Sequence, residues 1–505
     1  MIPPTQIFPA DEHNRRLADN VDLATIANPR PAARYNLVVI GAGTAGLVAA
    51  AGAAGLGAKV ALIERHLMGG DCLNYGCVPS KALLSASRAA AATNSASRMR
   101  IAPPIDEQEI DFGAVMERMR RLRADLSVND SIKRFTALGV ELFHGQARFT
   151  GRDCVEVEGA TLRFSRAVIA TGARALAPPI AGLAESGYLT NETVFALETM
   201  PRRLAVIGAG PIGCELAQAF RRFGADVTLF ELMPRILPRE DPDAASRIEQ
   251  ALACEGVAVL TASDIANVEN RGGARLIRFT GEGVASELLV DEILIGAGRA
   301  PNVEELGLEA AGVQYGPLGV TVDNRLRTTN SRIYAAGDVC TAFKFTHLAD
   351  AMARIVIRNA LFFGRARVSQ LTTPWCIYTD PEIAHVGLSA ADAAQRAIPI
   401  RTFRQELAEV DRAVIDGETA GFAKIHVAAD SDRILGATIV ASHASEMISE
   451  LTLAISKGIG LGALADVIHP YPTQAEAIRK LADAYNRTRL TPLVKRLFAA
   501  WMSWR

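Results

Sequence analysis

Two cysteines, Cys72 and Cys77, have the residue type and spacing for redox chemistry. They lie in the run 69–81, which reads Gly-Gly-Asp-Cys-Leu-Asn-Tyr-Gly-Cys-Val-Pro-Ser-Lys. Thiols so spaced can form a disulfide across one helical turn, and a position near the N-terminus of their helix would lower a thiol pKa. A buried inert pair and half of a zinc site are the alternatives, although the sequence has no second cysteine pair to complete four zinc ligands. The pair is therefore a candidate for two-electron dithiol–disulfide chemistry.

A glycine-rich turn lies shortly before the cysteine run, at residues 41–46, which read Gly-Ala-Gly-Thr-Ala-Gly. An apolar strand-like segment precedes it, an alanine-rich segment follows it, and a second apolar segment ends at Glu64. In a dinucleotide-binding unit the glycines allow a tight turn, close approach of a pyrophosphate and close packing of helix on strand, and the acid binds a ribose diol. This assigns Gly41, Gly43, Gly46 and Glu64 to a nucleotide site.

The same unit occurs a second time, at residues 204–231, with Gly208, Gly210, Gly213 and Glu231 in the matching places. The acid follows the first glycine by 23 positions in both copies, as the positions of Glu64 and Glu231 show. One such motif is weak evidence, whereas two matched copies are strong. They imply two dinucleotides, one held as a prosthetic group and one exchanging. Glu231 would repel a 2′-phosphate and so favours NADH over NADPH, a preference that the nearby Arg235 could soften.

Length and composition limit the number of domains and the classes of protein to which the chain can belong. The 505 residues are too many for one ordinary domain, and 49% hydrophobic with 22% charged residues permits a large core. The net charge of −1 gives no indication of nucleic acid binding. The five remaining cysteines are scattered, and residues 1–34 do not resemble a signal peptide, so we expect a cytoplasmic protein. Residues 37–58 carry no charge, but their glycines and strand-like start favour a buried strand, turn and helix over a membrane span.

These motifs resemble those of the pyridine-nucleotide disulfide oxidoreductases, which include lipoamide dehydrogenase, glutathione reductase and mercuric reductase. Further matches occur at 170–172 (Ala-Thr-Gly), 333–338 (Ile-Tyr-Ala-Ala-Gly-Asp) and 381–387 (Pro-Glu-Ile-Ala-His-Val-Gly). The resemblance implies FAD, NADH or NADPH, and a homodimer whose active sites are shared across the interface. It also implies an α/β fold of two Rossmann-like domains, the FAD domain split by an inserted NAD(P) domain, with an α+β dimerisation domain after them.

The domain boundaries implied by the resemblance follow the motifs. They are an N-terminal extension at 1–34, an FAD domain at 35–170 and 298–368, an NAD(P) domain at 171–297, a dimerisation domain at 369–487 and a basic amphipathic tail at 488–505.

The resemblance also implies residue roles. Cys77 would face the flavin, where its thiolate makes a charge-transfer contact, and Cys72 would face the substrate. Lys81 and Glu215 match a pair beside the flavin N5, and Asp338 would bind the ribityl chain. The remaining cofactor-binding residues that the resemblance implies are Thr171, Gly172, Gly298 and His347.

One segment departs from the lipoamide dehydrogenase pattern. Residues 469–476 read His-Pro-Tyr-Pro-Thr-Gln-Ala-Glu, so Tyr471 replaces the histidine that acts as general base for a thiol substrate in those enzymes, while Glu476 is kept. A tyrosine with a pKa of about 10 is a poor base at neutral pH. Mercuric reductases also have tyrosine here, where it assists metal binding at the cysteine pair. His469, two residues earlier, remains an alternative base.

The sequence therefore predicts an FAD-dependent NAD(P)H oxidoreductase that resembles mercuric reductase most. Electrons would pass through Cys72 and Cys77 to a soft acceptor, with Hg(II) held transiently by both thiolates. The first and last cysteines are Cys72 and Cys376, so the terminal cysteine pairs that deliver mercury in many mercuric reductases are lacking. A lipoamide dehydrogenase-like or small-disulfide reductase and a non-enzymatic FAD/NAD-binding redox sensor stay open as alternatives.

The C-terminal tail places Leu493, Leu497, Trp501 and Trp504 on one helical stripe with basic residues beside it. A helix lying on a membrane surface would have this pattern, and so would a helix docked on the protein's own dimer. Docking or partner contact is the favoured interpretation, because one short helix with few charges binds membrane weakly.

Overall fold

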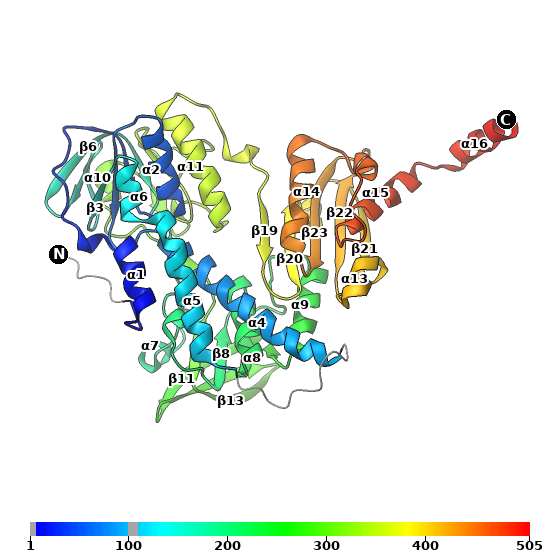
Figure 1. Cartoon of the computed structure of the whole chain (residues 1–505), viewed down its shortest axis with the longest axis horizontal. Helices are drawn as coiled ribbons and strands as arrows, with labels where there is room; N and C mark the ends of the chain where they lie inside the picture. Colours follow the sequence, from blue (N-terminus) through cyan, green and yellow to red (C-terminus); the bar gives the residue numbers. More distant parts are fainter. Residues whose placement is uncertain (1–6, 99–109) are drawn as a thin grey trace. The chain divides into compact units, whose positions relative to one another are not determined.

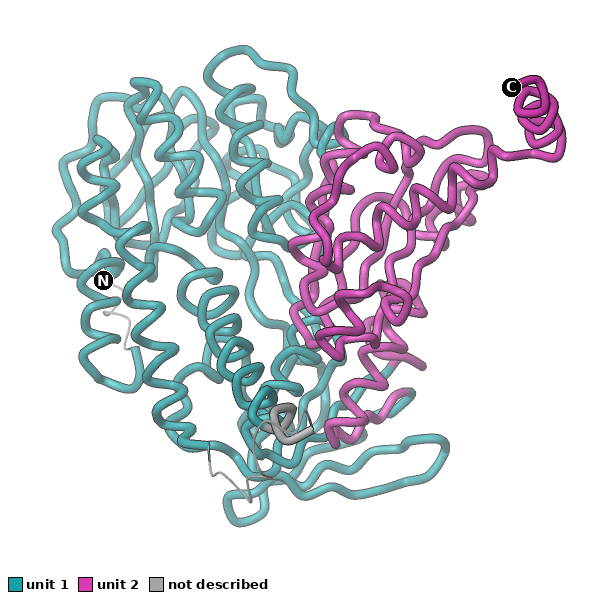
Figure 2. The backbone as a smooth tube through the Cα atoms, turned by 45° about the vertical axis from the view of Figure 1, so that its right-hand side comes forward, with its two compact units in different colours: residues 1–232, 262–371 teal, residues 233–261, 372–505 magenta. Residues whose placement is uncertain are grey.

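The computed structural model describes residues 7–98 and 110–505 (Figure 1), so the first six residues of the predicted N-terminal extension lie outside it. The chain forms two compact units (Figure 2). Unit 1 comprises Met1–Leu232 and Ala262–Leu371, and unit 2 comprises Met233–Thr261 and Thr372–Arg505. The domain boundaries predicted from the sequence remain predictions.

The first sheet of unit 1 has a parallel core that carries the first glycine motif. Its strand order is β3-β2-β1-β6-β5-β4, and β18 also pairs with β6. The strands are β1 (Tyr35–Ile40), β2 (Val60–Glu64), β3 (Val140–His144), β4 (Arg148–Gly151), β5 (Cys154–Val157), β6 (Ala160–Ile169) and β18 (Ile333–Ala335). β1 is apolar at almost every position because both faces of the strand are covered.

Helices cover this sheet. Figure 1 shows α2 (Thr44–Gly55) beside α11 (Thr346–Leu361), and the small residues of α2 permit that packing, since a Cβ on Gly52 would lie 2.6 Å from Ile357 Cδ1. Residues 37–58 are thus a buried strand, turn and helix, as predicted. The cysteine run spans α3 (Gly70–Asn74) and the start of α4 (Cys77–Arg98). The neighbouring helices are α1 (Glu12–Val21), α5 (Phe112–Leu126) and α6 (Ile132–Ala137).

The second glycine motif lies on a separate parallel sheet of unit 1. There β8 (Arg203–Ile207) pairs with both β9 (Asp226–Phe230) and β14 (Glu292–Ile295), and α8 (Pro211–Arg222) follows β8. An antiparallel sheet accompanies it, made of β11 (Ser263–Arg271), β12 (Ala274–Gly281) and β13 (Val284–Val290). The other elements of unit 1 are β7 (Ala173–Ala175), α7 (Leu183–Ser186), β15 (Arg299–Pro301), α10 (Leu308–Ala311), β16 (Tyr315–Gly316) and β17 (Gly319–Val320).

Unit 2 is an α+β layer built on one antiparallel sheet of order β19-β20-β23-β22-β21. Its strands are β19 (Pro374–Ile377), β20 (Glu382–Gly387), β21 (Ile400–Glu406), β22 (Phe422–Ala428) and β23 (Ile434–Ala441), with β10 (Ala258–Leu260) outside this sheet. Its helices are α9 (Pro242–Cys254), α12 (Ala390–Gln395), α13 (Asp411–Asp416), α14 (Ala444–Lys457), α15 (Glu476–Thr488) and α16 (Pro492–Ser503). The predicted fold class is confirmed.

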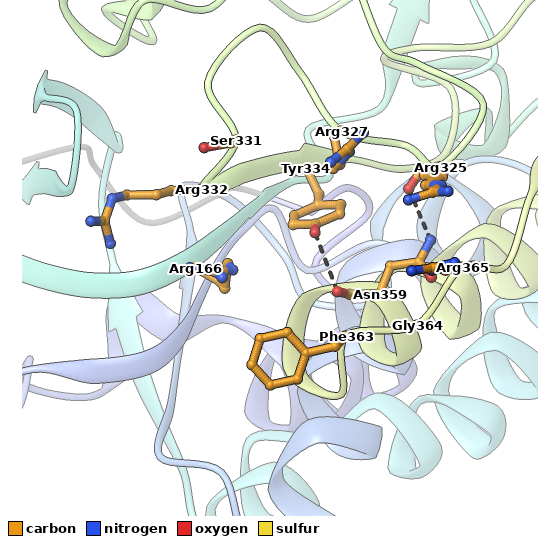
Figure 3. A pocket seen from close by; sticks show the side chains of 10 residues that line it. All are labelled: Arg166, Arg325, Arg327, Ser331, Arg332, Tyr334, Asn359, Phe363, Gly364 and Arg365. Atoms are coloured by element: carbon orange, nitrogen blue, oxygen red, sulfur yellow. Dashed lines mark hydrogen bonds between the residues drawn. The ribbon is translucent and has the colours of Figure 1, made fainter.

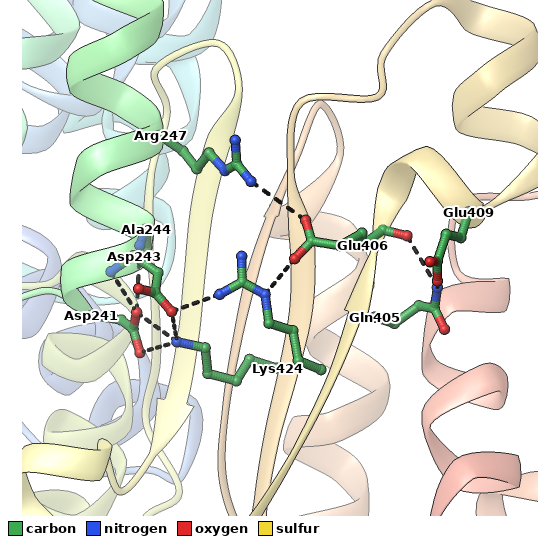
Figure 4. Close-up of polar contacts among 9 residues, drawn as sticks. Asp241, Asp243, Ala244, Arg247, Gln405, Glu406, Glu409 and Lys424 are labelled. Carbon is green, nitrogen blue, oxygen red and sulfur yellow. Dashed lines mark hydrogen bonds and ion pairs between the residues drawn. The ribbon is translucent and has the colours of Figure 1, made fainter.

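A buried charge cluster ties α9 to the sheet within unit 2 (Figure 4). Lys424 Nζ on β22 donates to Asp241 Oδ1 at 2.9 Å and to Asp243 Oδ2 at 2.6 Å. Asp241 also caps α9, because its carboxylate accepts from the backbone N–H groups of Asp243 and Ala244. One carboxylate thereby satisfies a helix terminus and neutralises a buried lysine.

The last helix differs from the others because it buries none of its own side chains. The stripe predicted from the sequence is exposed, with Leu497 at 60% and Trp504, which caps the helix, at 94% of their full accessible areas. Across residues 7–98 and 110–505, none of the helices combines the length and apolarity needed to cross a bilayer.

Candidate active site

The two cysteines come together from two consecutive helices. Cys72 lies in α3, Tyr75 ends that helix, and Cys77 is the first residue of α4. The prediction that the pair spans one turn of a single helix was wrong, because α3 ends at Tyr75, whose φ of −139° is not helical, and Cys77 begins a new helix. The thiols are close enough for Cys72 to hydrogen-bond Cys77.

The surroundings of the two thiols shift their pKa values in opposite directions. The hydrogen bond from Cys72, with smaller contributions from the Thr346 hydroxyl and Lys81, outweighs burial and lowers the pKa of Cys77 to about 6. The position at the N-terminus of α4 favours the same thiolate. The same hydrogen bond, together with burial, raises the pKa of Cys72. Cys77 is therefore the thiolate of the reduced pair and Cys72 the thiol, as expected for a cysteine near a helix N-terminus.

Thr346 is a site residue that the sequence analysis missed. Its Oγ1 lies 3.3 Å from Cys77 Sγ, and it is the first residue of α11. It is 269 positions away from Cys77, so no local pattern could reveal it. The adjacent His347, predicted from the resemblance, stacks on Phe345 with ring centroids 5.5 Å apart.

A buried polar chain holds the backbone between the cysteines. Arg123 of α5 donates from Nη1 to Asn74 O at 2.8 Å and from Nη2 to Asn14 Oδ1 at 2.7 Å. Asn74 itself donates to Met68 O and Gly70 O. Desolvation lowers the pKa of Arg123 to about 10, which leaves it charged at neutral pH. The N-terminal helix α1, through Asn14, thus supports the cysteine loop indirectly.

Lys81 and Glu215 form the pair that the resemblance implies. Lys81 Nζ lies 2.7 Å from Glu215 Oε2, with Lys81 on α4 and Glu215 on α8. The carboxylate is 5% exposed and the lysine 37%, so the pair is more than a surface contact. A fixed cation thereby lies one helical turn beyond Cys77.

The first glycine motif forms a cradle that fits FAD. A Cβ on Gly41 would lie 2.4 Å from Ala170 O, and one on Gly46 would lie 1.8 Å from Gly41 O, so both positions require glycine. Gly43 caps α2, and Glu64 Oε2 accepts from the Ala42 N–H at 2.6 Å. One cavity is lined by Gly41, Glu64 and Thr171 together. These residues fit the adenosine end of a dinucleotide.

The other end of that cradle offers polar groups of opposite sign. Arg299 Nη2 lies 3.2 Å from Asp71 Oδ2, and Arg299 Nε lies 4.0 Å from Asp338 Oδ2. Among the described residues none hydrogen-bonds the buried Nε of Arg299, which leaves a donor for a bound acceptor. Burial raises the pKa of Asp338. This arrangement fits the predicted contact of Asp338 with a ribityl hydroxyl.

Hydrogen bonds join the segment at residues 170–172 and the segment around Gly298. Thr171 Oγ1 donates to Asn302 O at 2.7 Å, and Asn302 N donates to Gly172 O at 3.0 Å. Gly298 O accepts from the backbone N–H of Leu176. The predicted residues of this region thus lie together on the strands β7 and β15 and their flanks.

The second cradle repeats the first in detail. A Cβ on Gly208 would lie 2.7 Å from Ala297 Cα, and one on Gly213 would lie 2.0 Å from Gly208 O. Gly210 caps α8, and Glu231 Oε2 accepts from the Ala209 N–H at 2.9 Å, as Glu64 does from Ala42. The duplication predicted from the sequence therefore extends to equivalent hydrogen bonds.

The segment 469–476 lies in unit 2. Tyr471 is 72% exposed, and its hydroxyl donates to Asp411 Oδ2 at 2.9 Å, which raises the pKa of Tyr471. His469 is held between Glu450 (Nε2 to Oε1, 3.1 Å) and Val467 O rather than by Glu476. Within the described part of the chain, the buried Oε2 of Glu476 has no hydrogen-bond partner.

The described residues contain no group of three or more His, Cys, Asp or Glu side chains arranged to hold a metal ion.

Two dinucleotide cradles and a paired dithiol on one polypeptide define a flavin-type dithiol–disulfide oxidoreductase. The chain matches the family model "Pyridine nucleotide-disulphide oxidoreductase" over residues 35–353 and that family's dimerisation domain over residues 373–482. The protein therefore belongs to the pyridine nucleotide-disulphide oxidoreductases.

Relatives within the family carry different names. The chain is 35% identical to a mercuric reductase of Bacillus cereus over 448 residues (88% of this chain, 70% of that protein). It is 34% identical to a dihydrolipoyl dehydrogenase of Thermus scotoductus over 462 residues (90% and 98%). Among solved structures, a Cu(II) complex of the HOCl-induced flavoprotein disulfide reductase RclA of Escherichia coli superposes with a TM-score of 0.79 at 28% identity (88% and 99%).

Proposed function

We propose that this protein passes two electrons from NADH or NADPH through Cys72 and Cys77 to a soft, thiophilic metal ion, with Hg(II) as the model acceptor. The observation that carries the proposal is the unequal pair: a Cys77 thiolate beside a Cys72 thiol, with Tyr471 where thiol-oxidising relatives have a histidine base.

The residues have distinct tasks in this proposal. FAD, when bound in the first cradle, would supply the two-electron redox chemistry that links the nicotinamide to the cysteine pair. Lys81, held by Glu215, fixes a positive charge near the flavin, and Cys72 together with Thr346 stabilises the Cys77 thiolate. Hg(II) binds Cys77 and Cys72, and the Cys72 proton is released as its thiolate forms. Two electrons then convert Hg(II) to Hg(0), so NAD(P)H and Hg(II) yield NAD(P)⁺, one proton and Hg(0).

Tyr471 of the partner subunit is the residue that favours a metal over a dithiol. A dithiol substrate needs a base, and a tyrosine whose pKa is raised by Asp411 cannot serve at neutral pH. His469 is already bonded to Glu450. A phenol can instead act as an oxygen ligand or hydrogen-bond donor at a thiolate-bound metal. The mercuric reductase relatives and the Cu(II)-bound relative support this choice.

For the nicotinamide we propose NADH. Glu231 ends its strand where a 2′-phosphate would meet a carboxylate. Arg235, the residue that could soften this preference, donates to the backbone carbonyls of Pro238 and Glu240 at 2.6 and 3.0 Å, so its guanidinium is engaged within its own loop.

The first experiment is anaerobic release of Hg(0) from Hg(II) in excess small thiol, driven by NADH or by NADPH. Cys72→Ser should lose release while keeping bound flavin and its reduction by NADH. Tyr471→Phe should slow release without affecting that reduction. Full release by Cys72→Ser would contradict the dithiol route.

A small disulfide is the second candidate, favoured by the dihydrolipoyl dehydrogenase relative. NADH-dependent reduction of lipoamide that requires Cys72, with no Hg(0) release, would assign the protein to it. Flavin reduction without turnover of either acceptor would favour a redox sensor.

A further inference from the structure

A second cavity in unit 1, of about 430 Å³, is lined by five arginines and by no acidic residue (Figure 3). Its volume lies within the range of small-molecule sites. The arginines are Arg166, Arg325, Arg327, Arg332 and Arg365. The cavity lies at the amino end of β18, which Arg332 precedes, whereas Asp338 follows the carboxyl end of that strand. It is therefore separate from the FAD cradle.

Most of this positive charge is not compensated. Arg327 pairs with Asp323 at 2.8 Å, but in the described part of the chain no carboxylate pairs with the other four guanidinium groups. The Nε of Arg166 is buried and has no partner among the described residues. Guanidinium groups gathered in this way repel one another unless an anion lies between them, and their planar donors match phosphate oxygens.

The cavity has a rigid frame. Asn359, which is 7% exposed, donates from Nδ2 to Arg325 O at 3.1 Å and to Ala366 O at 2.9 Å, and its Oδ1 accepts from the Ala366 N–H. One buried amide thus joins the loop that carries Arg325 to the loop that carries Arg365. The Tyr334 hydroxyl donates to Asn359 O, as Figure 3 shows.

An aromatic ring stands at the same cavity. Phe363 is 91% exposed and has a φ of +52°, a left-handed conformation that a bulky residue rarely adopts. Neither the exposure nor the backbone conformation of Phe363 favours the folded chain, and its ring is free to contact a ligand at the cavity. In Figure 3 its side chain extends from the segment that follows α11, among the residues that line the cavity.

We propose that this cavity binds a nucleoside polyphosphate, with the arginines on its phosphates and Phe363 stacked on its base. The ligand is distinct from FAD and from the nicotinamide, and the site does not depend on the proposed electron acceptor.

The test is calorimetric titration of ATP and of inorganic tripolyphosphate into FAD-loaded enzyme that is saturated with NAD⁺, which blocks the nicotinamide site. We expect ATP to bind more tightly than tripolyphosphate. An Arg325→Gln/Arg365→Gln double variant should weaken both by about tenfold or more. Arg15→Gln, an exposed arginine of α1, is the matched control and should change neither.

The variant Phe363→Gly tests the stacking of the base separately from the binding of the phosphates. Glycine suits the left-handed backbone, so the fold is kept, and retained flavin absorbance checks this. ATP should then bind no better than tripolyphosphate, whose affinity stays unchanged. The proposal is overturned if the double variant binds ATP with unchanged affinity. It is also overturned if Phe363→Gly binds ATP with unchanged affinity. Tighter binding of a single-stranded RNA with the same arginine dependence would overturn it in favour of nucleic acid.

Discussion

Cys77 is the residue on which the proposed chemistry depends, and its charge state can be measured. Because its pKa is lowered to about 6, the reduced enzyme should alkylate at Cys77 with a rate that rises through pH 6 and is level above about pH 7. Lys81→Met and Thr346→Val should both move this midpoint upward, since each removes a group that stabilises the thiolate. Iodoacetamide labelling with peptide mapping measures each cysteine separately. A midpoint at 8.5 or above, as for an ordinary thiol, would contradict the assignment.

Lys424 makes a second prediction at the scale of single residues. Lys424→Ala leaves the carboxylate of Asp241 buried without its cation, so the free energy of unfolding should fall by about 3–5 kcal/mol. Arg412→Ala removes a surface pair with Asp416 and should cost at most about 1 kcal/mol. Urea unfolding of both variants checks this. Equal losses would show that the buried pair adds no more than an exposed one.

At the scale of elements, α1 should affect a site that it does not touch. Asn14→Ala leaves a buried N–H of Arg123 without its acceptor, which should lower the free energy of unfolding by about 1–3 kcal/mol. The hydrogen bond from Arg123 to Asn74 O in the cysteine loop should also weaken. Hydrogen exchange of residues 68–77 should become faster, and turnover through the cysteines should fall while flavin reduction by NADH is kept. Asn20→Ala, on the same helix but bonded to Ser127, is the control and should leave that exchange unchanged.

The elements that the sequence predicted best are those with local, repeated patterns. Both glycine units were predicted down to the acids Glu64 and Glu231, because turn, strand and helix signals are contiguous in the chain. Thr346 and Arg123 could not be predicted, since they reach the cysteine loop from distant elements. The expected single helix is not formed, because the backbone of Tyr75 leaves the helical conformation between the two cysteines.

For the whole molecule, α16 is the element that needs a partner. A helix of 12 residues is marginal by itself in water, and its apolar stripe is exposed in the single chain. We expect it to dock on the protein in the homodimer. With Trp375→Phe as background, acrylamide should quench Trp501 and Trp504 weakly, and anionic vesicles should not shift their emission. A vesicle-induced blue shift would assign the helix to a membrane surface.

The pairing of β18 with β6 has a consequence for how the protein is made. Ile333 joins Ala167 in the first sheet, so the last strand of that sheet emerges from the ribosome 166 residues after its neighbour. At a synthesis rate of about 5–20 residues per second, this interval is on the order of 10–30 s. During that time Ala167–Ile169 of β6 pair with β1 on one side but lack β18 on the other, while the second glycine unit is synthesised and can fold. The nascent chain thus exposes a short unpaired strand edge for seconds, which is a site for non-native strand pairing during synthesis.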